Sequence, residues 1–137
     1  MKDLILKLKT LLPARDFIVT GSFVLSEYGL VPKAKVRDLD IVLVEAEQST
    51  LETLNRLMAE FPAQTKPLKI EVRKEEDGKV AKKSAVNPNH PTAIFMFDKV
   101  KVDVFNLSSD TGSTITVDSL KYHTVDHIIT SKKNYGR

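Results

Sequence analysis

The chain has 137 residues, and its composition is that of an ordinary globular domain. Hydrophobic residues make up 42% and charged residues 28%, which excludes a disordered tail. This length fits one compact domain, residues 1–137, that buries roughly two thirds of the surface exposed by the unfolded chain. The absence of cysteine excludes a disulfide scaffold, a thiolate zinc site and a cysteine nucleophile.

The charge balance is only mildly basic. Lys and Arg number 21 and Asp and Glu 18, so the net charge is +3. This suits an anionic small ligand, whereas binding of nucleic acid is possible but not indicated. No apolar run reaches the about 18 residues of a membrane span, and the N-terminal apolar pattern contains charges that a signal peptide lacks. We therefore expect a cytoplasmic protein without a membrane partner.

The beginning of the chain predicts a helix, a strand and a second helix. Apolar residues recur at helical spacing over 4–12 and predict an amphipathic helix that ends before a proline. The apolar run over 17–20 predicts a buried strand. A short helix is expected over 23–28, with Ser22 as its N-terminal cap and Gly29 at its end.

The middle of the chain holds the strongest strand pattern. The run over 38–44 is apolar on both faces, which predicts a strand inside a sheet, and a basic loop over 31–37 precedes it. Ser49 and Glu52 form a capping-box pattern at the start of an amphipathic helix that extends to about residue 61.

The rest of the chain predicts further strands and a final helix. Residues 68–73 alternate as in an exposed strand, and 75–91 form a polar loop. A β-hairpin is expected over 93–105, and a last helix is expected to be capped by Asp118 and to end near Lys133. This mixture predicts an α+β (α/β) fold with a small mixed sheet flanked by helices.

Three aspartates occupy strand positions where charge is costly. Asp38 and Asp40 alternate at the start of the interior strand, so they point to one face about 7 Å apart. Asp103 lies between valines in a later strand. A divalent cation offsets the repulsion among such carboxylates, and Mg²⁺ prefers carboxylates with phosphate oxygens and water. The alternative is that the aspartates face solvent or pair with nearby cations, which are Lys33, Lys35, Arg37 and Lys101.

A glycine and a serine join the first strand to the short helix. Gly21 lacks a Cβ, so a phosphate can approach its backbone closely. Free backbone N–H groups at a helix start favour anions, and the hydroxyl of Ser22 can donate a further hydrogen bond. The alternative is an ordinary tight turn with a serine cap.

The order of these pieces resembles the DNA polymerase β-like nucleotidyltransferase superfamily, specifically its minimal members. The motifs are Thr20-Gly21-Ser22, Asp38-Leu39-Asp40 and Asp103, and the resemblance covers 17–105. It implies transfer of a nucleoside monophosphate from an NTP to an unidentified acceptor. Two Mg²⁺ ions, with Mn²⁺ as a substitute, would be held by the three aspartates, which are also the implied catalytic residues.

The resemblance also implies a set of nucleotide-binding residues. Gly21 and Ser22 would hold the triphosphate. Lys132 lies in the C-terminal helix, where basic residues of this superfamily often face the nucleotide; Lys133 and Arg137 are candidates on the same basis. The loop that carries Lys33 and Arg37 could steer phosphate or be a solvated basic loop.

Three alternatives remain open. The chain could be a non-catalytic nucleotide-binding or regulatory module of the same fold, such as a toxin–antitoxin component with a protein partner. It could also be an unrelated interaction domain in which Asp38 and Asp103 lie far apart. His123 and His127 are four residues apart on the expected last helix, but no third ligand has convincing spacing, so a surface histidine pair is favoured over a zinc site.

Overall fold

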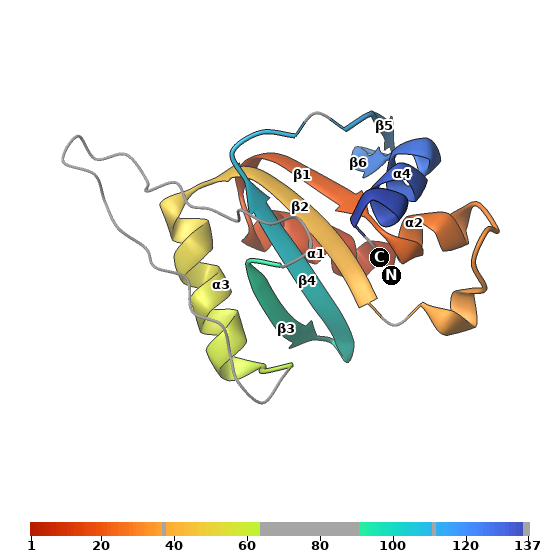
Figure 1. Cartoon of the computed structure of the whole chain (residues 1–137). Coiled ribbons are helices and arrows are strands. Elements are labelled where there is room, and N and C mark those ends of the chain that lie inside the picture. The colour runs from red at the N-terminus through yellow and green to blue at the C-terminus, as the bar shows by residue number, and fades with distance from the viewer. Residues whose placement is uncertain (37, 64–90, 111, 136–137) are drawn as a thin grey trace.

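A computed structural model describes residues 1–36, 38–63, 91–110 and 112–135 of the chain. Within these ranges a mixed sheet of six strands is flanked by helices (Figure 1), as the sequence predicts. The elements are α1 (Lys2–Leu11), β1 (Ala14–Thr20), α2 (Ser22–Glu27), the 3-10 helix η1 (Lys33–Lys35), β2 (Asp38–Ala46), α3 (Gln48–Glu60), β3 (Ala93–Phe97), β4 (Val100–Leu107), β5 (Thr114–Val117), β6 (Leu120–His123) and α4 (Val125–Tyr135). None of the helices in the described part is long and apolar enough to cross a membrane.

The strands lie in the order β3-β4-β2-β1-β6-β5. The pair β2–β4 and the pair β1–β6 are parallel, and the other three neighbouring pairs are antiparallel. Strand β2 therefore lies in the interior of the sheet, between β4 and β1. This position explains why its sequence is apolar on both faces.

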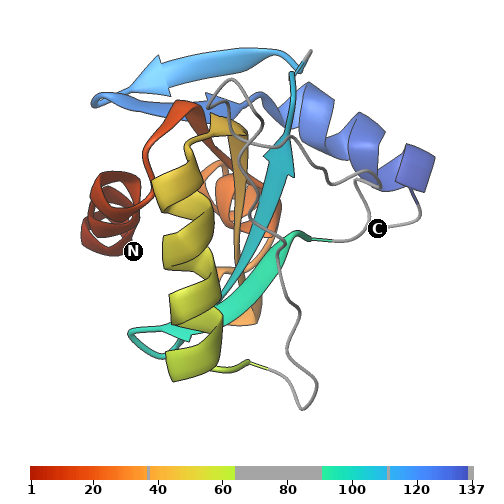
Figure 2. The same ribbon diagram turned by 90° about the vertical axis from the view of Figure 1, so that its left-hand side faces the viewer.

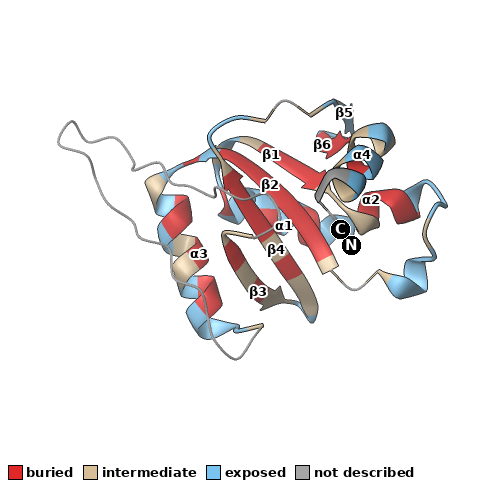
Figure 3. Cartoon of the chain, in the orientation of Figure 1, coloured by how far each residue is buried: buried red, intermediate tan, exposed pale blue. Residues whose placement is uncertain are grey.

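The two faces of the sheet bury different sets of residues. Leu39, Ile41 and Leu43 of β2 are fully buried in the main core, which also contains apolar residues of α1 and α3. Val42 and Val44 point to the opposite face, where they form a smaller cluster. Figure 2 shows α1 and α4 on opposite sides of the sheet, and Figure 3 shows how continuously β2 is buried. The three aspartates lie on the face with the smaller cluster.

Two expected helix caps are wrong. Gly21, not Ser22, is the N-cap residue of α2, and Ser22 is the first helical residue. Helix α3 starts after Glu47, so Ser49 lies inside the helix and makes no capping bond. Gly29 does end α2: its φ is +75°, and its N–H donates to the carbonyl of Ser26.

The start of the last helix is also misplaced in the sequence prediction. Asp118 does not cap a helix but forms, with Ser119, the turn of a hairpin between β5 and β6. Both turn residues have positive φ, at 51° and 68°, which suits a two-residue hairpin turn. Helix α4 begins later, and the hydroxyl of Thr124 accepts a hydrogen bond from the N–H of His127. The strand expected over 68–73 and the loop over 75–91 fall wholly or mostly outside the described residues.

Helix α1 offers a matched test of the core. Leu8 is fully buried in the main core, whereas Leu6 is 46% exposed on the same helix. We expect Leu8→Ala to lower the free energy of unfolding by about 2–5 kcal/mol, since it removes buried apolar surface and leaves a cavity. Leu6→Ala should change it by less than about 0.5 kcal/mol. Urea unfolding followed by circular dichroism measures both, and equal losses would contradict the packing of α1.

Candidate functional site

One row of side chains crosses the sheet at the start of β2. Asp40 is directly opposite Asp103 on the parallel strand β4 and opposite Thr20 on the antiparallel strand β1. Residues paired in this way point to the same face, and neighbouring strands lie about 4.8 Å apart. Asp38 lies two residues earlier on β2 and shares this face. The structure thus brings the three aspartates together, and the alternative in which Asp38 and Asp103 lie far apart does not hold.

The three carboxylates differ in their exposure and share one lysine. Asp40 is 9% exposed, and the side chains of Asp103 and Asp38 are 14% and 45% exposed. Lys101, which is opposite Asp38, places its Nζ 3.8 Å from Asp38 Oδ2 and 3.8 Å from Asp103 Oδ1. A positive charge therefore already lies between two of the carboxylates, as one of the sequence alternatives anticipates.

Gly21 allows the Asp40 carboxylate to lie directly against the chain after β1. Its backbone has φ +78° and ψ −160°, a combination that is almost restricted to glycine. A Cβ on this residue would collide with the carboxylate of Asp40 and lie 2.9 Å from its Cγ. The turn between β1 and α2 and the aspartate pattern on β2, which are distant in the sequence, thus meet in one place.

Ser22 and Lys132 extend this place toward α4. Lys132 Nζ donates to Ser22 Oγ over 3.4 Å, which joins the last turn of α4 to the first residue of α2. Ser22 and Lys132, two of the expected nucleotide-binding residues, are therefore in contact, and Ser22 directly follows Gly21 in the sequence. Their role in binding a nucleotide stays a prediction.

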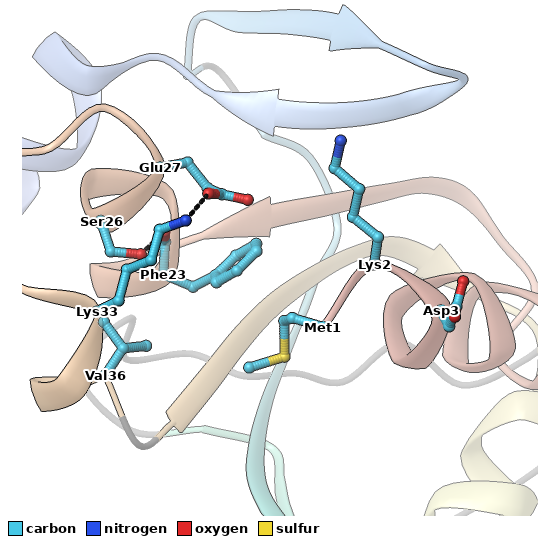
Figure 4. Close-up of a pocket in the computed structure, with 8 residues that line it drawn as sticks. All are labelled: Met1, Lys2, Asp3, Phe23, Ser26, Glu27, Lys33 and Val36. Carbon is cyan, nitrogen blue, oxygen red and sulfur yellow. Dashed lines mark hydrogen bonds and ion pairs between the residues drawn. The ribbon is translucent and has the colours of Figure 1, made fainter.

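Lys33 has a different neighbourhood. Its Nζ pairs with Glu27 Oε2 at 3.5 Å, and both residues line a cavity together with Met1 and Phe23 (Figure 4). Among the described residues that line this cavity, none is one of the three aspartates. The cavity therefore gives no support to a nucleotide-binding role for Lys33 beside the aspartates, and that role stays a prediction. Arg37 and Arg137 lie outside the described residues, and their roles stay predictions.

Sequence reasoning considered the histidine pair of a second cluster as a surface pair, but it missed the third member, Asp110, and the burial of His123. His123, at the end of β6, donates from Nε2 to Asp110 Oδ2 over 2.9 Å, and its ring lies 4.2 Å from the ring of His127. The two histidines are not on one helix, because only His127 belongs to α4. The histidine spacing was the available signal; Asp110, which follows β4, could not be connected with it before the topology was known.

Burial and neighbouring charges shift the pKa values in this second cluster. Burial and the charge of His123 hold the pKa of His127 below its usual value. Burial raises the pKa of Asp110, but its hydrogen bond with His123, the charge of that ring and the N–H of Gly112 outweigh this effect, so the pKa lies below its usual value. Both shifts favour a neutral imidazole beside an ionised carboxylate.

Comparison with known proteins relates the fold to one solved structure. No family model and no curated protein matches the chain. The crystal structure of a "putative nucleotidyltransferase" from Thermotoga maritima superposes with a TM-score of 0.53 and 14% sequence identity, over 99% of this chain and 82% of that one. The chain has a nucleotidyltransferase-like fold. At this identity the likeness concerns the fold alone, and membership of the DNA polymerase β-like superfamily stays a prediction.

A comparison of Gly21 and Gly29, which both have positive φ, distinguishes the cost of backbone strain from the cost of a clash with Asp40. Gly21→Ala should lower the free energy of unfolding by about 1–3 kcal/mol for its backbone alone, with a further loss because Asp40 must move. Gly29→Ala is the control, because Gly29 has φ +75° but nothing within 4 Å of the added Cβ. Urea unfolding of both variants measures the difference. A loss at Gly21 no larger than that at Gly29 would contradict the close approach of Asp40.

Proposed function

We propose that the chain is a metal-dependent nucleotidyltransferase that moves a nucleoside monophosphate from an NTP to a hydroxyl group of an unidentified acceptor. The observation that carries this proposal is the pairing of Asp40 with Asp103 on parallel strands, with the Asp40 carboxylate against Gly21. The nucleotidyltransferase-like fold supports it. We place the activity in the cytoplasm, as the composition suggests.

The aspartates fit Mg²⁺ by their chemistry and arrangement. Asp38, Asp40 and Asp103 offer only carboxylate oxygens, and all point to one face from two neighbouring strands. Hard cations such as Mg²⁺ and Mn²⁺ prefer oxygen ligands and complete their shell with phosphate and water. When bound, two such ions neutralise the charge of the triphosphate and lower the pKa of the attacking hydroxyl.

The residues of the chain then have distinct tasks. The backbone at Gly21 and the hydroxyl of Ser22 bind phosphate oxygens, and Lys132, which contacts Ser22, compensates their charge. The acceptor oxygen forms a bond to the α-phosphorus while the bond from that phosphorus to the bridging oxygen breaks, and pyrophosphate leaves. In this proposal Asp103 accepts the proton of the hydroxyl. Most of the rate enhancement would come from positioning and charge neutralisation.

Lys101 favours a second candidate function. Because its ammonium group lies 3.8 Å from a carboxylate oxygen of each of Asp38 and Asp103, it neutralises charge that Mg²⁺ would otherwise neutralise. This arrangement suits a non-catalytic nucleotide-binding or regulatory module of the same fold, with a protein partner. Such a module would bind an NTP through Gly21, Ser22 and Lys132 without turning it over.

Replacement of Asp40 tests the proposed function. We expect calorimetry to show binding of Mg²⁺-NTP to the wild-type chain, and Asp40→Asn to weaken it because a buried ligand loses its charge. Release of pyrophosphate should fall at least about a hundredfold. Asp98→Asn, on the exposed turn between β3 and β4, is the matched control. Equal binding by Asp40→Asn and wild type would overturn the proposal, whereas binding without pyrophosphate release, with an extract of host cells supplied as the source of acceptor, would favour the non-catalytic alternative.

Replacement of Lys101 tests the competition between lysine and metal. Lys101→Met should raise the affinity for Mn²⁺, measured by the loss of its free electron paramagnetic resonance signal, because the carboxylates then lack their nearby cation. Lys7→Met, on the exposed side of α1, removes the same charge away from the aspartates and should leave the affinity unchanged. An unchanged or lower affinity in Lys101→Met would show that the carboxylates do not bind the ion.

A further inference from the structure

Three side chains from separate parts of the chain converge beside the aspartate row. Asp110 follows β4, His123 ends β6, and His127 lies in the first turn of α4. One ligand atom of each lies within 4.8 Å of the others, and His123 Nε2 and Asp110 Oδ2 are 2.9 Å apart. We call these three residues the imidazole–carboxylate cluster.

We propose that the imidazole–carboxylate cluster binds a divalent transition-metal ion of the zinc type. Two imidazole nitrogens and one carboxylate oxygen are a ligand set that suits Zn²⁺ and Co²⁺ better than Mg²⁺. Zn²⁺ binds such ligands at about 2.0–2.2 Å, so ligand atoms around a tetrahedral ion lie about 3.3–3.5 Å apart. To reach this spacing, the pair of His123 Nε2 and Asp110 Oδ2, now 2.9 Å apart, would open slightly, and the wider pairs, within 4.8 Å, would close. The fourth position is left for water or another small ligand.

Gly112 shows that both imidazole rings converge on one point. A Cβ on Gly112 would lie 2.6 Å from Cε1 and Nε2 of His127 and 3.0 Å from Nε2 of His123. The Nε2 edges of both rings therefore face the same small region of backbone, which only a glycine leaves open. Asp110 also accepts a hydrogen bond from the Gly112 N–H, so this backbone helps to orient the carboxylate.

Thr20 holds His123 in the orientation that a ligand needs. Its Oγ1 lies 2.8 Å from His123 Nδ1, while Nε2 faces Asp110. A metal-binding histidine usually donates its other ring N–H to an oxygen, which fixes the ring and its tautomer. A hydroxyl both donates and accepts, so Thr20 can hold the ring with or without a proton on Nδ1.

The pKa shifts of His127 and Asp110 have the direction that metal binding requires. A metal ion binds a neutral imidazole and an ionised carboxylate. Burial and the charge of His123 lower the pKa of His127, and the contacts with His123 and Gly112 lower the pKa of Asp110 despite its burial. These shifts agree with the geometry, on which the proposal stands.

A bound ion would join three elements at the edge of the aspartate row. It would hold the segment after β4, the end of β6 and the first turn of α4 together. Helix α4 also carries Lys132, which contacts Ser22, so the ion would fix the helix that presents this lysine. The proposal does not depend on nucleotidyl transfer, because the cluster shares no residue with the three aspartates.

Co²⁺ and Zn²⁺ are the probes for this site. The full chain, stripped with a chelator, is titrated with Co²⁺ and followed by visible absorption, and then with Zn²⁺ by calorimetry. We expect one tightly bound ion per chain, a visible band typical of nitrogen and oxygen ligands, and a higher melting temperature with Zn²⁺. Absence of binding would overturn the proposal.

Matched variants assign the binding to the cluster. His127→Gln should lower the affinity at least about tenfold, and it avoids the more buried His123, whose replacement can prevent folding. Asp126→Asn changes an exposed neighbour on the same helix turn and should bind as the wild type does. Equal affinities of these two variants would overturn the assignment.

Two further variants separate the orienting hydroxyl from the aspartate site. Thr20→Val keeps the side-chain shape but removes the hydroxyl, and should weaken Co²⁺ binding about tenfold. Asp103→Asn should keep the Co²⁺ band, because its carboxylate is not in the cluster. Loss of the band in Asp103→Asn would place the ion at the aspartates and overturn the proposal. Absence of Mg²⁺-NTP binding by the wild-type chain, with its Co²⁺ band present, would count against the proposed function alone.

Discussion

The register between β2 and β4 is the constraint on which the candidate site depends. A shift by one residue would turn Asp103 to the opposite face of the sheet, away from Asp40. This shift would also expose Val102 and Val104, which are fully buried in the main core on the other face. Burial of apolar side chains on one face therefore fixes the position of the carboxylates on the other. Function and stability rest here on the same pairing.

The same register carries the row of side chains beyond the aspartates. Thr20 lies opposite Asp40 on one side and is hydrogen-bonded to His123 on the other. Thr20 is followed by Gly21, where an added Cβ would collide with the Asp40 carboxylate. Strand β1 therefore connects the imidazole–carboxylate cluster to the aspartates, although the two share no ligand.

The sequence predicts those parts of the fold that are encoded locally. Helix α1, strand β2 and the hairpin of β3 and β4 follow from apolar periodicity, and their placement is confirmed. The hairpin of β5 and β6 was missed because its turn, Asp118-Ser119, lacks the glycine that usually marks a positive φ. The caps were misplaced because several polar residues near a helix start offer similar hydrogen bonds, and tertiary packing selects among them.

Contacts between segments that are distant in the chain could not be predicted from the sequence. The pattern of Asp38 and Asp40 indicates one face of a strand, but only the sheet order shows that Asp103 is beside them. Lys101 was one of several candidate cations, and its place between two carboxylates depends on the same order. Asp110 follows β4, outside any helix or strand, and no spacing rule links it to the histidines.

The three aspartates and the imidazole–carboxylate cluster differ in the kind of ion that their ligand atoms favour. Carboxylate oxygens alone suit hard ions that keep water and phosphate in their shell, whereas imidazole nitrogens suit ions of the zinc type. Lys101 lies near Asp38 and Asp103, whereas Asp40 lies against Gly21, where a Cβ would collide with its carboxylate. The conformation of Gly21, which almost only glycine adopts, therefore indicates that close approach to this carboxylate is itself the feature that the fold maintains.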